Sequence, residues 1–95
     1  MERYAKQIIL KEVGEEGQRK LLASKVVIIG CGALGSMMAN NLARAGIGKI
    51  KVIDRDYVEL DNLQRQFLYD EEDAKQSLPK AIACYNKLRK INSEI

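Results

Sequence analysis

The chain has 95 residues, 31% of them charged, and a formal net charge of +3. This length allows one small domain with a modest core, and the interleaving of basic with acidic residues does not indicate a nucleic-acid surface. No apolar run of about 18 residues is present, so no transmembrane helix is expected. The N-terminus is too polar for a signal peptide. Two widely separated cysteines, Cys31 and Cys84, suggest a reducing cytoplasm and small core residues, not catalytic thiols.

The first half of the chain predicts two helices followed by a strand, a helix and a second strand. Apolar residues favour short helices over residues 3–11 and 15–23, with glycines between them. The apolar run at 26–29 predicts a buried strand, and apolar residues at helical spacing predict a helix over about 34–45. Residues 49–53 alternate between lysine and aliphatic side chains, which predicts a strand with one wetter face.

The second half of the chain is expected to be a long polar loop followed by one helix. The loop runs from Asp54 to Gln76, with a short helical turn at 62–66. Ser77 is a plausible N-cap for the last helix, and Pro79 fits its first turn. Apolar residues repeat every three positions along that helix and predict its buried face, namely Ile82, Tyr85, Leu88 and Ile91.

This order of elements predicts an α/β fold, a Rossmann-like βαβ nucleotide-binding unit preceded by two helices. We expect a single domain over residues 1–95, with the N-terminal helices in 1–24 and the β-α-β-loop-α unit in 25–95. A parallel sheet of this kind requires a third strand after the last helix. The chain is therefore expected to be truncated before the sheet is complete, either as a fragment of a larger protein or as a piece completed by a partner.

The spacing G-x-G-x-x-G follows the first predicted strand directly. Gly30 would permit the tight turn, Gly32 would let backbone approach a phosphate, and Gly35 would let the helix pack on the strand. The helix N-terminus offers unpaired N–H groups to phosphates. Asp54, 19 residues past the last glycine, is placed to accept hydrogen bonds from a ribose. The pattern predicts a nucleotide site, and the alternative is a glycine-rich packing turn without a ligand.

The segment that follows Asp54 is more specific. It contains N-L-Q-R-Q at residues 62–66, and it resembles the ThiF/MoeB/HesA family and the adenylation domains of ubiquitin-activating enzymes. Four further motifs resemble segments of that family and extend the resemblance over essentially the whole chain: Arg3-Tyr4-x-x-Gln7-Ile8, Gly17-Gln18-x-x-Leu21, Gly46-Ile47-Gly48 and Ile91-Asn92.

The resemblance implies ATP-dependent adenylation. Family members use ATP and Mg²⁺ to adenylate the C-terminal glycine carboxylate of a ubiquitin-like sulfur-carrier protein of the ThiS or MoaD kind, in thiamine or molybdopterin biosynthesis, and release pyrophosphate. They are cytoplasmic homodimers. The Mg²⁺-linked aspartate and any zinc-binding cysteine pairs are expected past residue 95, in the full-length parent, so no metal ligand is expected among these residues. The 95 residues alone are expected to be weakly active or inactive.

The family's site residues carry over by position. Asp54 resembles the ribose-binding acid, and Arg65 and Lys80 resemble catalytic phosphate contacts. Lys6 resembles a cation donated in trans to the other protomer's site. Gln66 is expected to support the loop from behind and Tyr69 only to pack. The remaining expected ATP-binding positions are Gly30, Gly32, Ala33, Gly35, Asp56, Asp61, Asn62, Leu63 and Gln64, with Asp56 open between a turn-forming and a binding role.

Three departures from the family pattern are visible. Lys6 replaces an arginine, which keeps the charge and loses the bidentate fork. Ser77 stands where a glycine precedes the family lysine, and the interval from Arg65 to Lys80 is two residues longer than in the bacterial members compared. Ala33 replaces a frequent glycine. These differences leave the charge of the site intact.

Other functions stay open at this stage. One alternative is an NAD(P)- or FAD-binding oxidoreductase domain, although hydride transfer does not need a phosphate-clamping loop. Another is a ThiF-like dimerisation module that is inactive as this fragment. Within adenylation itself, activation of a peptide carboxylate or of a tRNA base is also possible.

Overall fold

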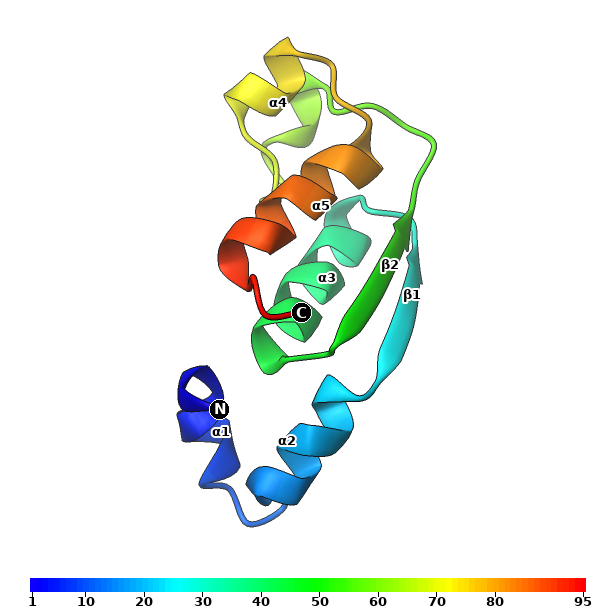
Figure 1. The fold of residues 1–95 in the computed structure, drawn as a ribbon. Helices are drawn as coiled ribbons and strands as arrows, with labels where there is room; N and C mark the ends of the chain where they lie inside the picture. Colours follow the sequence, from blue (N-terminus) through cyan, green and yellow to red (C-terminus); the bar gives the residue numbers. More distant parts are fainter.

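The computed structural model describes residues 1–95 as an elongated molecule of 43 × 20 × 20 Å, built on a two-stranded parallel sheet (Figure 1). Strands β1 (Lys25–Ile29) and β2 (Lys49–Ile53) pair in register from Lys25 opposite Lys49 to Ile29 opposite Ile53. Helices α3 (Ala33–Ala45) and α5 (Lys80–Ile91) lie side by side on one face of the sheet. The predicted βαβ unit is therefore confirmed.

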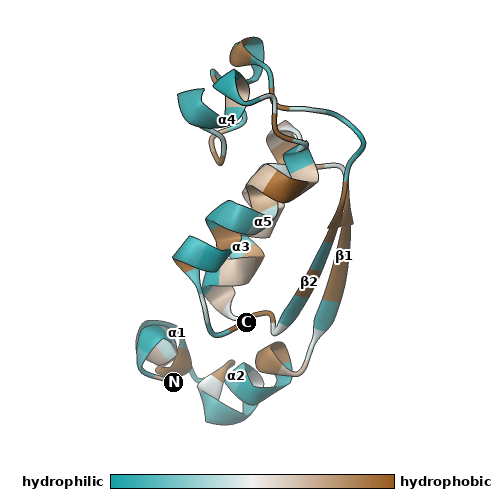
Figure 2. Cartoon of the chain, turned by 45° about the horizontal axis from the view of Figure 1, so that its top comes forward, coloured by the Kyte–Doolittle hydropathy of each residue, from teal (hydrophilic) through white to brown (hydrophobic).

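Strand β1 is buried on one face only, contrary to the prediction of a buried strand. Successive side chains of a strand point to opposite faces, and Val26 and Ile28 pack against the helices. Val27 and Ile29 lie on the other face, where no helix covers them, and both are exposed. Figure 2 shows β1 brown over most of its length and β2 alternating between teal and brown, with both helices on the same side of the two strands.

The N-terminal segment contains two helices, as predicted, but the first is shorter. A 3₁₀ turn η1 (Glu2–Tyr4) leads into α1 (Ala5–Ile8), which stops three residues before the expected end. Helix α2 (Gly14–Leu22) follows and contacts α1.

A buried polar network fixes this segment to the rest of its own chain. The Gln7 side chain donates to Gln18 and to the carbonyl of Ala45, and Gln18 donates to the same carbonyl over 3.0 Å. Ala45 ends α3, where helix carbonyls lack partners within the helix. Asn92 donates to the Tyr4 hydroxyl over 2.9 Å, which ties the start of the chain to the end of α5. These bonds explain why Gln18 and Asn92 are fully buried.

The segment from 54 to 76 is more ordered than the predicted polar loop. It holds a 3₁₀ turn, η2 (Leu60–Asn62), which leads into the expected turn at 62–66, where Gln66 N–H donates to the Asn62 carbonyl over 2.9 Å, and an unexpected helix, α4 (Glu71–Lys75). Helix α4 begins at a capping box in which the Asp70 carboxylate accepts from the Asp73 backbone over 2.9 Å and Asp73 reciprocates over 3.0 Å. Apolar residues scattered through the segment enter the core: Val58, Leu68 and Tyr69.

Helix α5 begins at Lys80, later than predicted. Ser77 is not its N-cap: this residue has φ of +49°, and Pro79 precedes the helix in an extended conformation. The predicted buried face is also partly wrong, because Ile82 and Tyr85 are 49% and 60% exposed.

The small residues of α5 allow it to approach α3 closely, so the helix turns these residues inward. Ala83 and Cys84 join Ala39 and Ala43 of α3 in the core. Cys31 and Cys84 are both fully buried, as predicted. None of the helices is long and apolar enough to cross a membrane.

Candidate functional site

The glycine turn after β1 leaves an open space above Gly32. Gly30 has φ of +96°, a conformation that favours glycine. A Cβ on Gly35 would lie 1.7 Å from the carbonyl oxygen of Gly30, so this glycine is required for the helix to sit against the turn. A Cβ on Gly32 would meet only Gln66 Nε2, at 3.8 Å. Since packing does not require a glycine at 32, the space is available to a ligand at the N-terminus of α3.

Asp54 links the end of β2 to this turn. Its Oδ2 accepts a hydrogen bond from the backbone N–H of Cys31 over 2.7 Å, and its Oδ1 accepts one from Asp56 over 2.7 Å. A carboxylate oxygen has two lone pairs, so each oxygen keeps one for a ribose hydroxyl. The Asp56 backbone shapes this corner, since its N–H binds Asp54 and its carbonyl accepts from Lys80.

Lys80 reaches the site through a short contact between two segments far apart in sequence. Residues Tyr57 and Pro79 form an antiparallel bridge, with Val58 N–H donating to Leu78 O over 2.8 Å and Lys80 N–H donating to Asp56 O over 2.8 Å. This bridge holds the first turn of α5 beside the carboxyl end of β2.

Lys80 is only 7% exposed, and it takes part in none of the four ion pairs of the molecule. The pKa of the Cys31 thiol in the glycine turn lies below its ordinary value, chiefly because of a hydrogen bond with the neighbouring Cys84 thiol; burial and Asp54 oppose this effect, and Tyr69 and Lys80 add to it only slightly. The ammonium group of Lys80 has no carboxylate partner and is not among the buried side-chain atoms that lack a hydrogen bond, so it reaches the surface and is free to contact an anion bound at the turn.

The side chain of Asn62 is engaged within its own loop. Its Oδ1 accepts from Glu59 N–H over 2.8 Å and its Nδ2 donates to Asp61 Oδ1 over 3.3 Å, which closes the 3₁₀ turn η2. Arg65 is exposed and donates through Nη1 to the carbonyl of Asp61 over 3.3 Å, so its guanidinium retains free donors. Leu63 packs on the core, whereas Gln64 is exposed.

The structure therefore brings five of the predicted site residues together at the glycine turn and places Lys6 far from them. Gly30, Gly32, Gly35 and Asp54 form the turn, and Lys80 is placed beside it. Lys6 is exposed on α1, at the end of the molecule away from the loop that joins β1 to α3, and so lies outside this chain's own turn (Figure 1).

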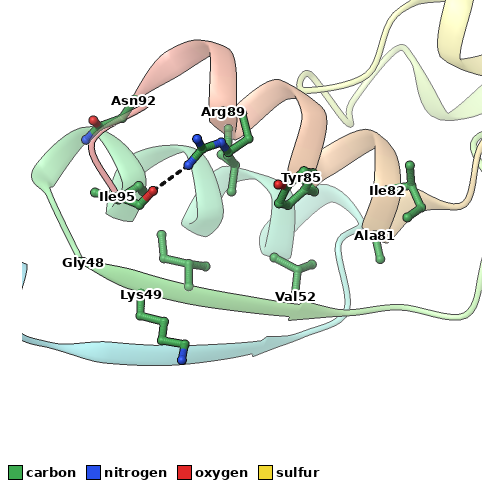
Figure 3. A pocket seen from close by; sticks show the side chains of 11 residues that line it. Gly48, Lys49, Val52, Ala81, Ile82, Tyr85, Arg89, Asn92 and Ile95 are labelled. Atoms are coloured by element: carbon green, nitrogen blue, oxygen red, sulfur yellow. Dashed lines mark hydrogen bonds between the residues drawn. The ribbon is translucent and has the colours of Figure 1, made fainter.

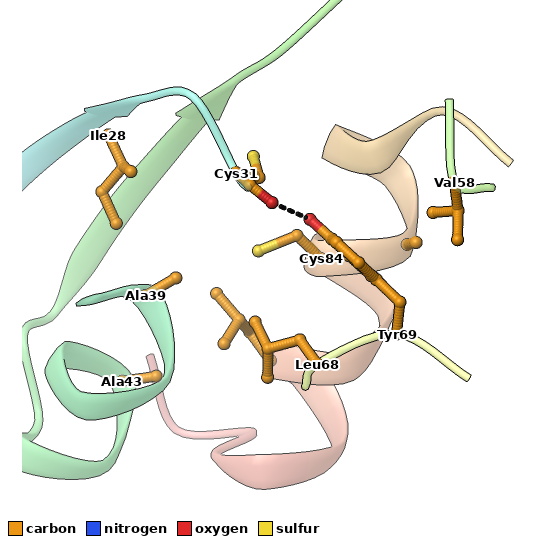
Figure 4. Close-up of a cluster of buried hydrophobic side chains, with 10 residues drawn as sticks. Ile28, Cys31, Ala39, Ala43, Val58, Leu68, Tyr69 and Cys84 are labelled. Atoms are coloured by element: carbon orange, nitrogen blue, oxygen red, sulfur yellow. Dashed lines mark hydrogen bonds between the residues drawn. The ribbon is translucent and has the colours of Figure 1, made fainter. Parts of the chain in front are cut away.

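Tyr69 has a role that the sequence did not reveal. Its hydroxyl donates to the carbonyl of Cys31 over 2.6 Å and so holds the glycine turn from the core side (Figure 4). Burial raises the pKa of Tyr69 above its ordinary value, and the neighbouring Cys31 raises it further, so the hydroxyl remains a donor. No local pattern distinguishes this tyrosine from a packing residue.

An apolar groove of about 430 Å³ lies elsewhere, between β2 and α5 (Figure 3). Its walls include Ile50, Val52 and Leu88, and Arg89 donates to the Ile95 carbonyl at its rim over 2.8 Å. No candidate site residue lines this groove. The 95 residues also bring together no group of three or more His, Cys, Asp or Glu side chains that could hold a metal ion.

The fold is a βαβ unit, and its glycine turn at a helix N-terminus, followed by a carboxylate at the end of the next parallel strand, is the arrangement typical of nucleotide-binding α/β proteins. Comparison with known sequences gives the family: the ThiF family profile matches residues 4–95, and the chain belongs to the ThiF family.

Three relatives illustrate the similarity. The chain is 52% identical over 93 residues to the sulfur carrier protein ThiS adenylyltransferase of Bacillus subtilis, covering 98% of this chain and 28% of the relative. It is 41% identical over 95 residues to the SAMP-activating enzyme E1 of Haloferax volcanii, covering 100% of this chain and 34% of that protein. The crystal structure of E. coli MccB with ATP matches with a TM-score of 0.86 and 38% identity, over 98% of this chain and 28% of that one.

The chain thus spans about a third or less of the length of these relatives. The relatives are adenylyltransferases and activating enzymes by name, which agrees with the class of enzyme expected from the N-L-Q-R-Q segment.

Proposed function

We propose that the protein binds ATP at the glycine turn and contributes this site to an adenylyltransferase that acts on the C-terminal carboxylate of a ubiquitin-like sulfur-carrier protein. The observation that carries the proposal is Lys80, a largely buried side chain whose ammonium group has no carboxylate partner, beside a turn whose Gly32 leaves open space. The names of the relatives support the reaction class, and the relative crystallised with ATP supports the nucleotide.

The chemistry that this site would serve is displacement at the α-phosphate. The carrier's carboxylate oxygen forms a bond to the α-phosphorus, the bond to the pyrophosphate oxygen breaks, and the products are an acyl adenylate and pyrophosphate. A carboxylate approaching an anionic phosphate is repelled, and negative charge gathers on the leaving group. Lys80 and Arg65 supply positive charge that reduces this repulsion and stabilises the leaving pyrophosphate. Asp54 orients the ribose, and the N-terminus of α3 binds the phosphates.

A magnesium ion is implied by the family, but these residues do not form a binding cluster for one.

We also propose that the enzyme is a cytoplasmic homodimer in which Lys6 reaches the partner's ATP site. Its exposure, and its distance along the molecule from its own glycine turn, support a role in trans over one in cis (Figure 1). In the full-length parent, mixed dimers of Lys6→Ala and Arg65→Ala protomers should recover part of the ATP–pyrophosphate exchange that each variant loses, because one of the two sites is intact. No recovery in verified mixed dimers would refute the trans arrangement.

Calorimetric titration with ATP, NAD⁺ and adenosine tests the ligand. We expect ATP to bind more tightly than NAD⁺, and Lys80→Met to weaken ATP at least tenfold while leaving adenosine unchanged, since the lysine would contact only phosphates. Lys90→Met on the same helix is the matched control, because Lys90 is exposed. Equal binding of ATP and NAD⁺, or an unchanged ATP affinity of Lys80→Met, would contradict the proposal.

A further inference from the structure

The side chain of Gln66 is buried with an unsatisfied hydrogen-bonding group. It is 3% exposed, and its Oε1 has no hydrogen-bond partner. Buried polar groups are almost always paired, because an unpaired amide loses its bonds to water without compensation. Methionine would fill a similar volume without this penalty. The amide is therefore not explained by packing.

The amide of Gln66 lies beside the glycine turn. Its Nε2 lies 3.8 Å from the place that a Cβ on Gly32 would occupy, so its two N–H donors border the open space above that glycine. Gly32 is also the N-cap of α3, where the first backbone N–H groups have no partner within the helix.

The backbone holds Gln66 in this position. Its N–H donates to the Asn62 carbonyl over 2.9 Å, and its own carbonyl accepts from Tyr69 N–H over 3.2 Å. Tyr69 in turn donates its hydroxyl to Cys31, within the turn itself (Figure 4). The amide is thus presented to the space above Gly32 by the segment that carries Asn62 and Arg65.

We infer that Gln66 is a phosphate-binding residue, which donates an Nε2–H hydrogen bond to the nucleotide phosphate lying over Gly32. This inference rests on the proposed ATP site and adds a neutral donor to its two cations. The unpaired Oε1 then lowers the stability of the ligand-free protein. The amide is kept because its Nε2 donates to the phosphate when nucleotide is bound.

Two substitutions of Gln66 test the role with ATP, ADP and adenosine as ligands in calorimetry, and with thermal unfolding of the ligand-free protein. Gln66→Met removes both polar atoms at similar volume. It should raise the unfolding midpoint and weaken ATP and ADP about tenfold, with adenosine unchanged. Gln66→Glu keeps the shape, removes the donor and adds negative charge, so it should weaken ATP more than Gln66→Met. Gln76→Met, an exposed glutamine in a different segment, should change neither affinity.

The outcomes separate this inference from the proposed function. If the unsubstituted protein binds no ATP, the proposed function fails, and the Gln66 assignment fails with it. If it binds ATP and Gln66→Met binds ATP equally well, only the Gln66 assignment fails. A lower unfolding midpoint for Gln66→Met would show that the amide is structural. Undiminished ATP binding by Gln66→Glu would show that residue 66 accepts from a hydroxyl instead of donating to a phosphate.

Discussion

Replacing either of two glycines of the turn, Gly32 or Gly35, by alanine should have very different effects on stability and on ATP binding. Alanine at 32 adds a methyl group that meets only Gln66 Nε2, at 3.8 Å, which is an ordinary contact, and residue 32 has a negative φ of −80°. The free energy of unfolding should therefore change by no more than about 1 kcal/mol, the size expected for an N-cap glycine replaced by alanine.

Alanine at 35 meets backbone instead of open space. Its Cβ would lie 1.7 Å from the Gly30 carbonyl oxygen, and a carbonyl in a strand-to-helix turn cannot rotate aside as a side chain can. The helix and turn must separate by about 1 Å or more, with a cost of about 3 kcal/mol.

Gly32→Ala, which should affect stability little, is the substitution that should weaken ATP binding. The Gly32→Ala methyl occupies the space above the turn that a phosphate requires, so ATP should bind at least tenfold more weakly, about 1.4 kcal/mol, to a protein that is still folded. Urea unfolding followed by circular dichroism measures stability, and calorimetry measures ATP affinity. If Gly32→Ala binds ATP as the unsubstituted protein does, or if Gly35→Ala is as stable as it, the geometry of the turn has been misinterpreted.

Three further substitutions test the elements around the site. Tyr69→Phe should lower the free energy of unfolding by about 1–2 kcal/mol at pH 7, because the hydrogen bond to the Cys31 carbonyl is lost. Burial raises the pKa of Tyr69 in the folded protein, so above about pH 10 the tyrosine ionises more readily in the unfolded state. The stability of the unsubstituted protein should therefore fall above that pH, and the difference from Tyr69→Phe should become smaller. A gap that is constant between pH 7 and pH 10.5 in urea unfolding would contradict this. Asp70→Ala should cost about 1 kcal/mol by removing the cap of α4, and an unchanged urea midpoint would show that the capping box contributes nothing. Ser77→Gly should stabilise by about 0.5 kcal/mol because residue 77 has φ of +49°, with Ser77→Ala, which keeps the strain, as the control that should not.

Local sequence patterns were sufficient for the βαβ unit. The run of aliphatic residues at 26–29, the three glycines at 30, 32 and 35, and the alternation at 49–53 act through neighbours a few residues apart. Each of them therefore predicted its element and its boundaries to within a residue or two. The same glycine spacing and Asp54 predicted the location of the candidate site. Helix α4 also had a local signal, the capping box at Asp70 and Asp73, which the interpretation of the segment as a polar loop missed.

The remaining features depended on contacts between residues far apart in sequence. The face that α5 buries was decided by how closely Ala83 and Cys84 approach α3, not by the spacing of its larger apolar residues. Only the tertiary structure brought Lys80 to the end of β2, through the bridge of Tyr57 with Pro79, and only it set Gln66 against Gly32. Burial is a property of what surrounds a residue, so the sequence could nominate a lysine and a glutamine, whereas the fold decided that both are buried beside the same glycine turn.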